Sequence, residues 1–247
     1  KMQVVRTTLR TFLYPHTSPT KCLPVAGLKS FAPPPAFGEI EYPERSRLRV
    51  IERSPRYPTG TRIFKMQKKL RLMRGPEPYH NTLLHKQYGI IATGGGRLKY
   101  GHFEMIRMTL LRNFNRIGLK DNVFAVWRID PPWQPVTKKS SGQRMGGGKG
   151  AVDHYVTPVK AGRVIVEIGG HCQYFEVKYI LKDIAAKLPF KAMAVSQDLM
   201  EKMVEDKRRA VEDNQHLWTW KYMIQNNMLG CHRWISPFDK LWFNEHK

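Results

Sequence analysis

Residues 164–196, VIVEIGGHCQYFEVKYILKDIAAKLPFKAMAVS, contain the clearest secondary-structure signal of the chain. The apolar run Val164–Ile168 has the length of a buried strand. Apolar side chains then recur at three- and four-residue steps, as on the buried face of an amphipathic helix: Val177, Ile180, Leu181, Ile184 and Leu188. Pro189 ends this helix, and Lys191–Ser196 is expected to form a short strand. The stretch therefore predicts a strand, a helix and a second strand.

The residues before this stretch contain the other elements of the predicted domain. A stripe at helical spacing predicts a helix with the buried residues Phe103, Ile106, Leu110 and Phe114. Short apolar or alternating runs predict strands at Tyr88–Ala92, Val123–Ile129 and Val152–Val159. Lys160–Arg163 has the composition of a hairpin turn, which would join Val152–Val159 to Val164–Ile168.

Glycine and proline residues mark the predicted loops. Gly94–Gly96 is expected to form a loop after the first strand. Pro131, Pro132 and Pro135 are expected to end the strand before them, because proline lacks a backbone donor, and a glycine-rich basic loop is expected to continue to Gly150. The order β, α, β, β, β, α, β predicts an α+β fold, a two-layer sandwich with an antiparallel or mixed sheet and two helices, rather than a doubly wound parallel sheet.

Four regions are predicted along the chain. Residues 1–60 hold nine of the 17 prolines, which predicts an extended basic tail that becomes ordered on a partner. Residues 61–87 form a basic arm, and residues 88–200 form the α+β domain. Residues 201–247 have roughly helical spacing and many aromatic side chains, which predicts a helical extension used for protein contacts. Its spacing places two opposite charges where they can form an ion pair: Glu205 and Arg209.

The charge balance predicts a polyanionic partner. The 247 residues include 42 Lys and Arg against 20 Asp and Glu, a formal net charge of +22. The excess is densest between residues 61 and 100, with nine basic residues and one acidic residue. Nucleic acid is therefore the favoured partner. An anionic membrane is second, because this stretch contains no amphipathic basic helix, and no apolar run approaches the roughly 18 residues of a transmembrane segment.

The arm has the pattern expected of a segment that contacts a phosphate backbone. Its bases are interleaved with apolar residues, without an acidic residue between them: Arg62, Lys65, Lys68, Lys69, Arg71 and Arg74. Two further bases precede the first predicted helix and are included in the predicted RNA-binding set: Arg97 and Lys99.

The glycine-rich loop does not match the common phosphate-binding motif of nucleotide-binding proteins. A GxxxxGK[ST] motif requires glycine where Gln143 stands and serine or threonine where Gly150 stands, so the loop is not a P-loop. A dinucleotide fingerprint that begins at Gly94 fails as well, because Lys99 occupies its third glycine position. The loop does offer flexible backbone that can approach a phosphate closely, together with four bases: Lys138, Lys139, Arg144 and Lys149.

No metal site or catalytic site is predicted. The cysteines Cys22, Cys172 and Cys231 are far apart and form no CxxC pair, which argues against a disulfide framework or a thiolate zinc site. His171–Cys172 and Cys231–His232 are neighbours in sequence, for which ordinary packing is the simpler explanation. No GxSxG or HExxH motif occurs. The acidic residues of the domain are not spaced as a pair for acid–base catalysis would be: Glu104, Asp121, Glu167 and Asp183.

The block from about Lys69 to Met200 resembles the universal large-subunit ribosomal protein family known in bacteria as L-sixteen. Three stretches carry the resemblance: Gly96-Arg97-Leu98 before the first helix, the loop Arg144–Gly150, and Ala185-Ala186-Lys187-Leu188-Pro189-Phe190-Lys191. The long extensions on both sides are similar to those of the mitochondrial branch of the family, which implies a location in the mitochondrial matrix, in the mitochondrial ribosome.

The resemblance implies a non-catalytic, cofactor-free protein that binds large-subunit rRNA near the peptidyl transferase centre and helps to position tRNA. Neighbouring mitochondrial ribosomal proteins would contact the two extensions. The arm would enter rRNA, and the loop that approaches tRNA would consist of Lys138, Lys139, Arg144, Met145, Gly146, Gly147, Gly148, Lys149 and Gly150. Gly147 departs from the pattern, because bacterial members commonly have lysine there.

Two other functions are compatible with the composition. A basic RNA-modifying or RNA-processing enzyme would use the glycine-rich loop for a cofactor and His154 or an acidic residue of the domain for catalysis. A DNA-compacting protein would bind duplexes without regard to sequence, and the glycine-rich and aromatic features favour it least.

Overall fold

The computed structural model describes residues 37–119 and 121–246, and it confirms the α+β class. The central elements are β1 (Tyr88–Ala92), β2 (Gly96–Lys99), α1 (Tyr100–Ile117), β3 (Val123–Trp127), β4 (Gln134–Lys138), β5 (Ala151–Val159), β6 (Val164–Gly170), α2 (Tyr174–Ala186) and β7 (Ala192–Ser196). They are preceded by the short 3-10 helix η1 (Leu70–Leu72) and followed by α3 (Gln197–Glu212), α4 (Trp220–Gln225), η2 (Met228–Arg233) and α5 (Pro237–Trp242).

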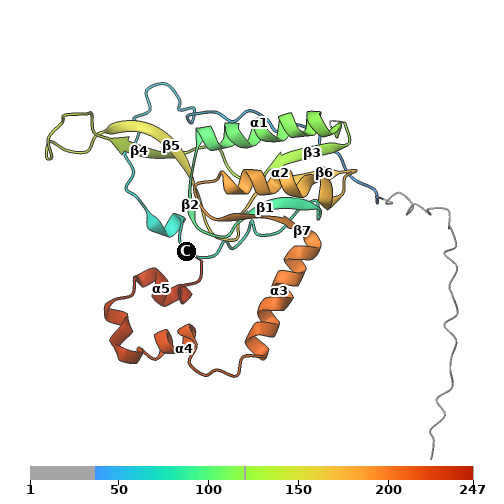
Figure 1. The fold of residues 1–247 in the computed structure, drawn as a ribbon. Helices are drawn as coiled ribbons and strands as arrows, with labels where there is room; N and C mark the ends of the chain where they lie inside the picture. The colour runs from blue at the N-terminus through green and yellow to red at the C-terminus, as the bar shows by residue number, and fades with distance from the viewer. Residues whose placement is uncertain (1–36, 120, 247) are drawn as a thin grey trace, which may run out of the picture. The chain divides into compact units, whose positions relative to one another are not determined.

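The larger of two sheets has four strands in the order β3-β6-β1-β7. All of its pairs are antiparallel, and one register row places Ala125, Ile168, Tyr88 and Ser196 side by side across the strands. The sequence predicted either an antiparallel or a mixed sheet, and the structure has an antiparallel one. Figure 1 shows α1 and α2 lying next to each other over these strands.

One hydrophobic core joins the helices to the larger sheet. The stripe predicted for α1 is buried at all four positions, and α2 buries Val177, Ile180, Leu181 and Ile184. Local interactions set the two ends of α1. The imidazole Nδ1 of His102 accepts a hydrogen bond from the backbone N–H of Lys99 at 3.0 Å, which caps the start of α1. Gly118 ends α1 in the left-handed region, with φ of 78°.

The smaller sheet contains two strands that were not predicted. Its order is β2-β5-β4, again antiparallel. The prediction of a loop at Gly94–Gly96 is wrong at Gly96, which begins β2 and where a Cβ would lie 2.3 Å from the ring of Phe190. The prediction that Pro135 lies in a region without strands is wrong as well. Pro135 belongs to β4, an edge strand, where the missing backbone donor is tolerated.

The predicted hairpin between β5 and β6 is also wrong. Both strands exist, but they belong to different sheets, and residues 160–163 form a corner between them. The backbone explains the corner, because Ala92 donates to the carbonyl of Arg163 at 2.9 Å and Gly162 donates to the carbonyl of Ala92 at 2.6 Å. The end of β1 thus occupies the positions at which a hairpin would close.

Part of the predicted N-terminal tail packs on the domain. Leu48 and Ile51 are buried, and the carbonyl of Ser46 accepts a hydrogen bond from the backbone of Ala125 at 2.9 Å. Trp127 donates its indole N–H to the carbonyl of Arg49 at 2.9 Å. The expectation of a tail without contacts to its own chain is therefore wrong for this segment, because two apolar side chains and the edge strand β3 hold it. Residues 1–36 of the predicted tail lie outside the described residues.

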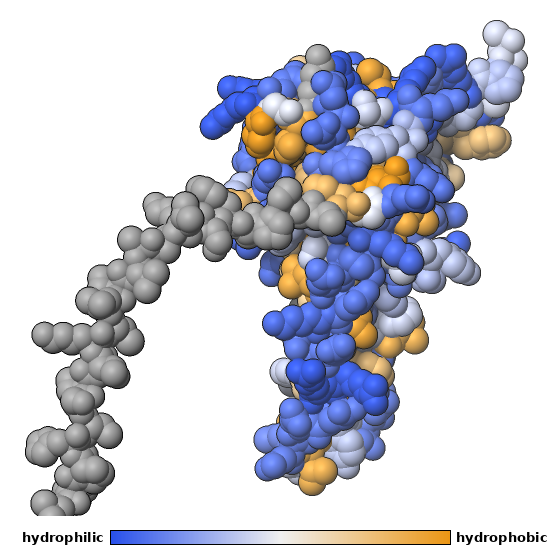
Figure 2. All heavy atoms as spheres, turned by 90° about the vertical axis from the view of Figure 1, so that its right-hand side faces the viewer, coloured by the Kyte–Doolittle hydropathy of each residue, from blue (hydrophilic) through white to orange (hydrophobic). Residues whose placement is uncertain are grey.

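The C-terminal extension is helical, with α3 of 16 residues followed by the shorter α4, η2 and α5, and α3 ends at Glu212, earlier than the pattern indicated. Residues of α3 are all at least partly exposed, and Figure 2 shows a mostly hydrophilic surface with separate apolar patches on the side of the molecule that bears this helix. The predicted pair of Glu205 and Arg209 forms with a distance of 3.4 Å. Farther along, Trp242 packs against Gly75, where a Cβ would lie 2.8 Å from the indole nitrogen. Among the described helices, none has the length and apolar composition to cross a membrane.

Candidate nucleic-acid interface

The basic arm is an exposed, mostly irregular segment. Between residues 61 and 74, only η1 has regular structure. Five of the predicted bases of the arm are exposed: Arg62, Lys65, Lys68, Lys69 and Arg71. The sixth, Arg74, is partly buried. With no acidic residue between residues 53 and 76, the arm presents uncompensated positive charge to solvent.

The glycine-rich loop connects β4 to β5 and is exposed from Ser140 to Lys149. Gly146, Gly147 and Gly148 all have positive φ, and no atom lies within 4 Å of a Cβ added to any of them. Backbone conformation, not crowding, therefore favours glycine at these positions. Gly150 is different, because a Cβ there would lie 2.5 Å from the carbonyl oxygen of Lys138. Met145 is 94% exposed.

Two lysines tie the arm to the loop. Lys65 Nζ donates to the carbonyl of Lys149 at 2.8 Å, and Lys149 Nζ donates to the carbonyl of Met66 at 2.6 Å. The two predicted basic segments, more than 60 residues apart in sequence, thus form one surface, which we call the arm–loop surface. Sequence reasoning placed both segments in RNA contacts but gave no sign that they touch, because a lysine–carbonyl contact has no sequence signature.

The bases of the loop have different tasks in the structure. Lys139 Nζ donates to the carbonyls of Arg144 and Gly146, at 3.3 and 2.6 Å, and so holds the loop in shape. Lys149 is committed to the tie described above. Within the part of the chain that the structure describes, the side chains of Lys138 and Arg144 form no hydrogen bond or ion pair, so they are the bases of the loop that remain available to a ligand.

The two predicted bases on β2 lie at different places. Arg97 lines a hollow of about 320 Å³ between the arm and β4, together with Lys68, Gln134 and Lys149. It therefore belongs to the arm–loop surface. Lys99 does not, because it lines a separate hollow with Arg53 and the Asp153–His154 pair.

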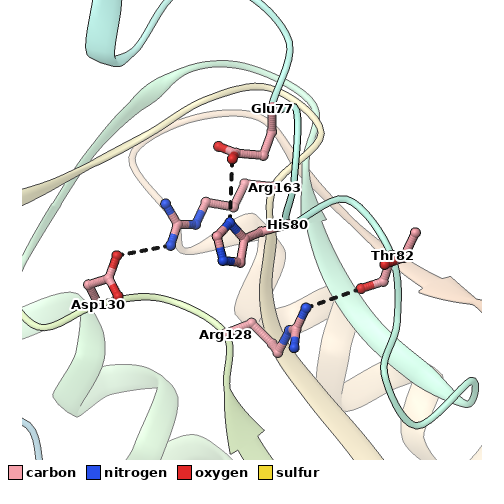
Figure 3. Close-up of polar contacts among 6 residues, drawn as sticks. All are labelled: Glu77, His80, Thr82, Arg128, Asp130 and Arg163. Atoms are coloured by element: carbon pink, nitrogen blue, oxygen red, sulfur yellow. Dashed lines mark hydrogen bonds and ion pairs between the residues drawn. The ribbon is translucent and has the colours of Figure 1, made fainter.

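A second basic hollow, of about 520 Å³, was missed in the sequence. Five arginines line it: Arg45, Arg47, Arg49, Arg128 and Arg163. Figure 3 shows Arg163 directed toward Asp130, at 3.1 Å, and Arg128 directed toward the carbonyl of Thr82, at 3.4 Å. The alternation of arginine along residues 45–49 was the available signal, since alternate residues of an extended segment share one face.

Several acidic residues of the domain, among them Glu104, Glu167 and Asp183 of those considered for catalysis, form ion pairs or hydrogen bonds within the domain. Glu104 pairs with Arg107 at 2.8 Å, and the guanidinium lowers the pKa of this carboxyl. Glu167 is buried, accepts the backbone N–H of Leu84 at 2.8 Å and lies 3.4 Å from Arg128 Nε. Two more acidic residues form ion pairs at 2.7 Å with a neighbour in sequence or on the same helix: Asp153 with His154 and Asp183 with Lys187.

His171 and Cys172, one of the two cysteine–histidine neighbours, have packing roles. The hydroxyl of Tyr42 contacts Nδ1 of His171, and Cys172 is buried, which raises the pKa of its thiol to about 12. Across residues 37–119 and 121–246, no group of three His, Cys, Asp or Glu side chains could hold a metal ion. Cys22 lies outside the described residues.

A small α+β domain whose basic arm and basic glycine-rich loop meet on one surface has the features of a protein that binds a folded polyanion, and nucleic acid in particular. Comparison with known proteins gives the family. The model of the ribosomal protein L16p/L10e family matches residues 58–195. The large ribosomal subunit protein uL16 of Neorickettsia sennetsu is 38% identical over 112 residues, which are 45% of this chain and 75% of that protein. The chain belongs to the ribosomal protein L16p/L10e family, as the resemblance implied.

The matched region contains the arm, both sheets and the helices α1 and α2. The segment that carries Arg45, Arg47 and Arg49 lies before it, and the helices α3 to α5 lie after it. Family membership supports a structural role in the large ribosomal subunit, and ribosomal proteins of this kind are generally not enzymes.

Proposed function

We propose that this chain is a structural component of the large subunit of the mitochondrial ribosome, that it binds large-subunit rRNA near the peptidyl transferase centre, and that it helps to position tRNA. The family membership supports the ribosomal part of this proposal. The observation that carries the RNA-binding part is the arm–loop surface, in which Lys65 and Lys149 join two cationic segments.

The arm is proposed to bind rRNA through its exposed bases. Such contacts release counterions from the RNA, so affinity depends steeply on salt. The irregular backbone of residues 61–74 suits this task, because it can follow an RNA groove that a regular helix would not fit.

The loop is proposed to contact tRNA through Arg144 and the glycine backbone. Lys139 satisfies two loop carbonyls, which leaves fewer unpaired oxygens to repel a phosphate. Gly147 removes one charge relative to bacterial members, so Arg144 is assigned the largest share of the contact. Its planar guanidinium can form two parallel hydrogen bonds to a phosphate or stack on a base.

The extensions are proposed to contact neighbouring mitochondrial ribosomal proteins in the matrix. The C-terminal extension exposes large apolar side chains, among them Trp218, Trp220 and Trp234. Both extensions lie outside the family match, as expected for parts that serve one branch of a family.

Sedimentation of the tagged full chain in a mitochondrial extract tests the proposal. The protein should migrate with the large ribosomal subunit in magnesium, and ribonuclease should release it. Migration as a free protein that ribonuclease does not affect would contradict the proposal and favour the enzyme alternative. Migration with a ribosome outside mitochondria would retain the ribosomal role and contradict the location.

A further inference from the structure

Two of the residues that line the hollow of about 320 Å³ between the arm and β4 each contain a buried polar atom without a hydrogen-bond partner. Gln134 is only 2% exposed, and its Oε1 accepts no hydrogen bond. Arg97 Nε is buried and equally without a partner. Both residues line the hollow. Unpaired buried polar groups are rare in folded proteins, because burial removes their hydrogen bonds to water.

The sheet register places these two residues on one face of the smaller sheet. Arg97 on β2 is paired with Pro158 on β5, and Gln134 on β4 is paired with Val156. Since Val156 and Pro158 are two residues apart on one strand, Arg97 and Gln134 lie on the same face of the smaller sheet. Met66 and Lys68 of the arm line the hollow beside them.

We propose that this hollow receives the base of one unpaired RNA nucleotide, whose edge pairs with Gln134 and Arg97. The proposal rests on the RNA-binding function proposed above and adds a site that reads a base. The hollow is about ten times the roughly 30 Å³ that one water molecule occupies in the liquid, so it has room for more than a bridging water.

The chemistry of the two unpaired atoms selects the ligand. Gln134 Oε1 requires a donor, whereas Arg97 Nε requires an acceptor. A phosphate would satisfy Arg97 but would place another acceptor beside Gln134 Oε1. The edge of a nucleobase carries donors and acceptors side by side, which suits both atoms.

The surroundings of the hollow fit a nucleotide as well. The apolar side chains of Met66, Pro135 and Val136 line it and can contact the face of a base, while Lys68 and Lys149 supply positive charge for the adjoining phosphates. The base must be unpaired, because the bases of a duplex are stacked and their pairing edges are occupied.

The test compares two single-stranded RNAs that differ in one position. The probes are a short fluorescent RNA and the same strand with a central abasic site, and affinity is measured by fluorescence anisotropy. The full wild-type chain is expected to bind the complete strand about tenfold more tightly than the abasic strand. Gln134→Leu should bind both strands with the affinity that the wild type has for the abasic strand. Gln215→Leu, at an exposed glutamine of the C-terminal extension, should behave as the wild type does.

A second measurement separates binding from folding. Gln134→Leu removes an unpaired buried amide and retains much of its volume, so its unfolding temperature should be equal to or above that of the wild type. If the leucine variant does not fold, Arg97→Met provides the same test, since it keeps the side-chain stem and removes the donor.

The outcomes distinguish this proposal from the general function. If the wild type binds neither strand, the proposed RNA-binding function fails. If it binds both strands equally with a steep salt dependence, RNA binding stands and the base site is refuted. If Gln134→Leu weakened the binding of both RNA strands equally, the proposal would also be overturned. Gln134 would then act on the RNA backbone or on the folding of the protein, not on the base.

Discussion

Neutralising the arm should reduce the salt dependence of RNA binding by a calculable amount. The perturbation is the joint replacement of Lys68, Lys69, Arg71 and Arg74 by glutamine. With on the order of ten phosphate contacts, the wild type should show a log–log salt slope of about −7 to −9, on the single-strand and duplex coefficients of roughly 0.7 and 0.9 per contact. Four lost contacts should therefore lower its magnitude by about 3 to 4.

The assay is the affinity for large-subunit rRNA over a series of salt concentrations. The matched control replaces Lys182, Lys202, Lys207 and Lys221 by glutamine. This variant has the same change of net charge, at exposed positions on α2, α3 and α4. The control should retain a slope close to that of the wild type.

An equal decrease in both variants would refute the arm as the contact surface and would indicate that net charge alone drives binding. A wild-type slope near −2 would refute the reasoning at its start, since it would leave only two or three phosphate contacts on the scale used here. Normal incorporation of the arm variant into ribosomal particles would also contradict the assignment.

Three other perturbations test separate parts of the structure. Arg144→Ala, which leaves the lysine contacts between the arm and the loop in place, should allow the large subunit to assemble yet weaken tRNA binding, measured by filter binding to purified particles; failure of assembly would make the loop an rRNA anchor. Glu167→Ala should lower the free energy of unfolding by about 1–3 kcal/mol in urea denaturation, because it leaves the backbone N–H of Leu84 without its acceptor; an unchanged free energy of unfolding would contradict this. Burial, and after it the nearby charge of Lys99, lowers the pKa of His102 below its ordinary value of 6.5. The folded protein therefore has its full stability from this group above pH 6.5, where the imidazole is neutral in both states. That stability is lost as the pH falls from 6.5 through the lowered pKa, because the unfolded chain binds the proton more readily. His102→Gln should flatten this part of the pH profile of thermal unfolding, and an unchanged profile would exclude His102 as its source.

The parts of the fold that were predicted correctly are those in which burial repeats along the chain. Phe103 and Leu110 recur at helical spacing because one face of α1 meets the sheet, so the core leaves a pattern in the sequence. Gly96 and Pro135 concealed two strands, since both residue types ordinarily interrupt strands. Their places in β2 and β4 depend on Phe190 and on the free edge of a sheet, neither of which is visible in a local window.

The bases of the proposed interface could be selected from the sequence by charge, whereas the contacts among them could not. Bases such as Lys68 and Arg144 were identified because clustered charge is visible in a sequence. The contacts of Lys65 and Lys149 and the isolation of Gln134 arise only when distant segments meet. A buried glutamine without a partner has no local signature, because its sequence neighbours say nothing about the strand beside it.

The junction between β2 and α1 has a mechanical consequence. The strand ends at Lys99 and the helix begins at Tyr100, without a connecting residue. Any ligand that pulled on the loop would load β5, whose hydrogen bonds to β2 would transfer the load to this strand and from there directly into α1. The loop is therefore connected through two paired strands to a helix of the hydrophobic core, and motion at its tip should arise in the glycines of the loop rather than at its base.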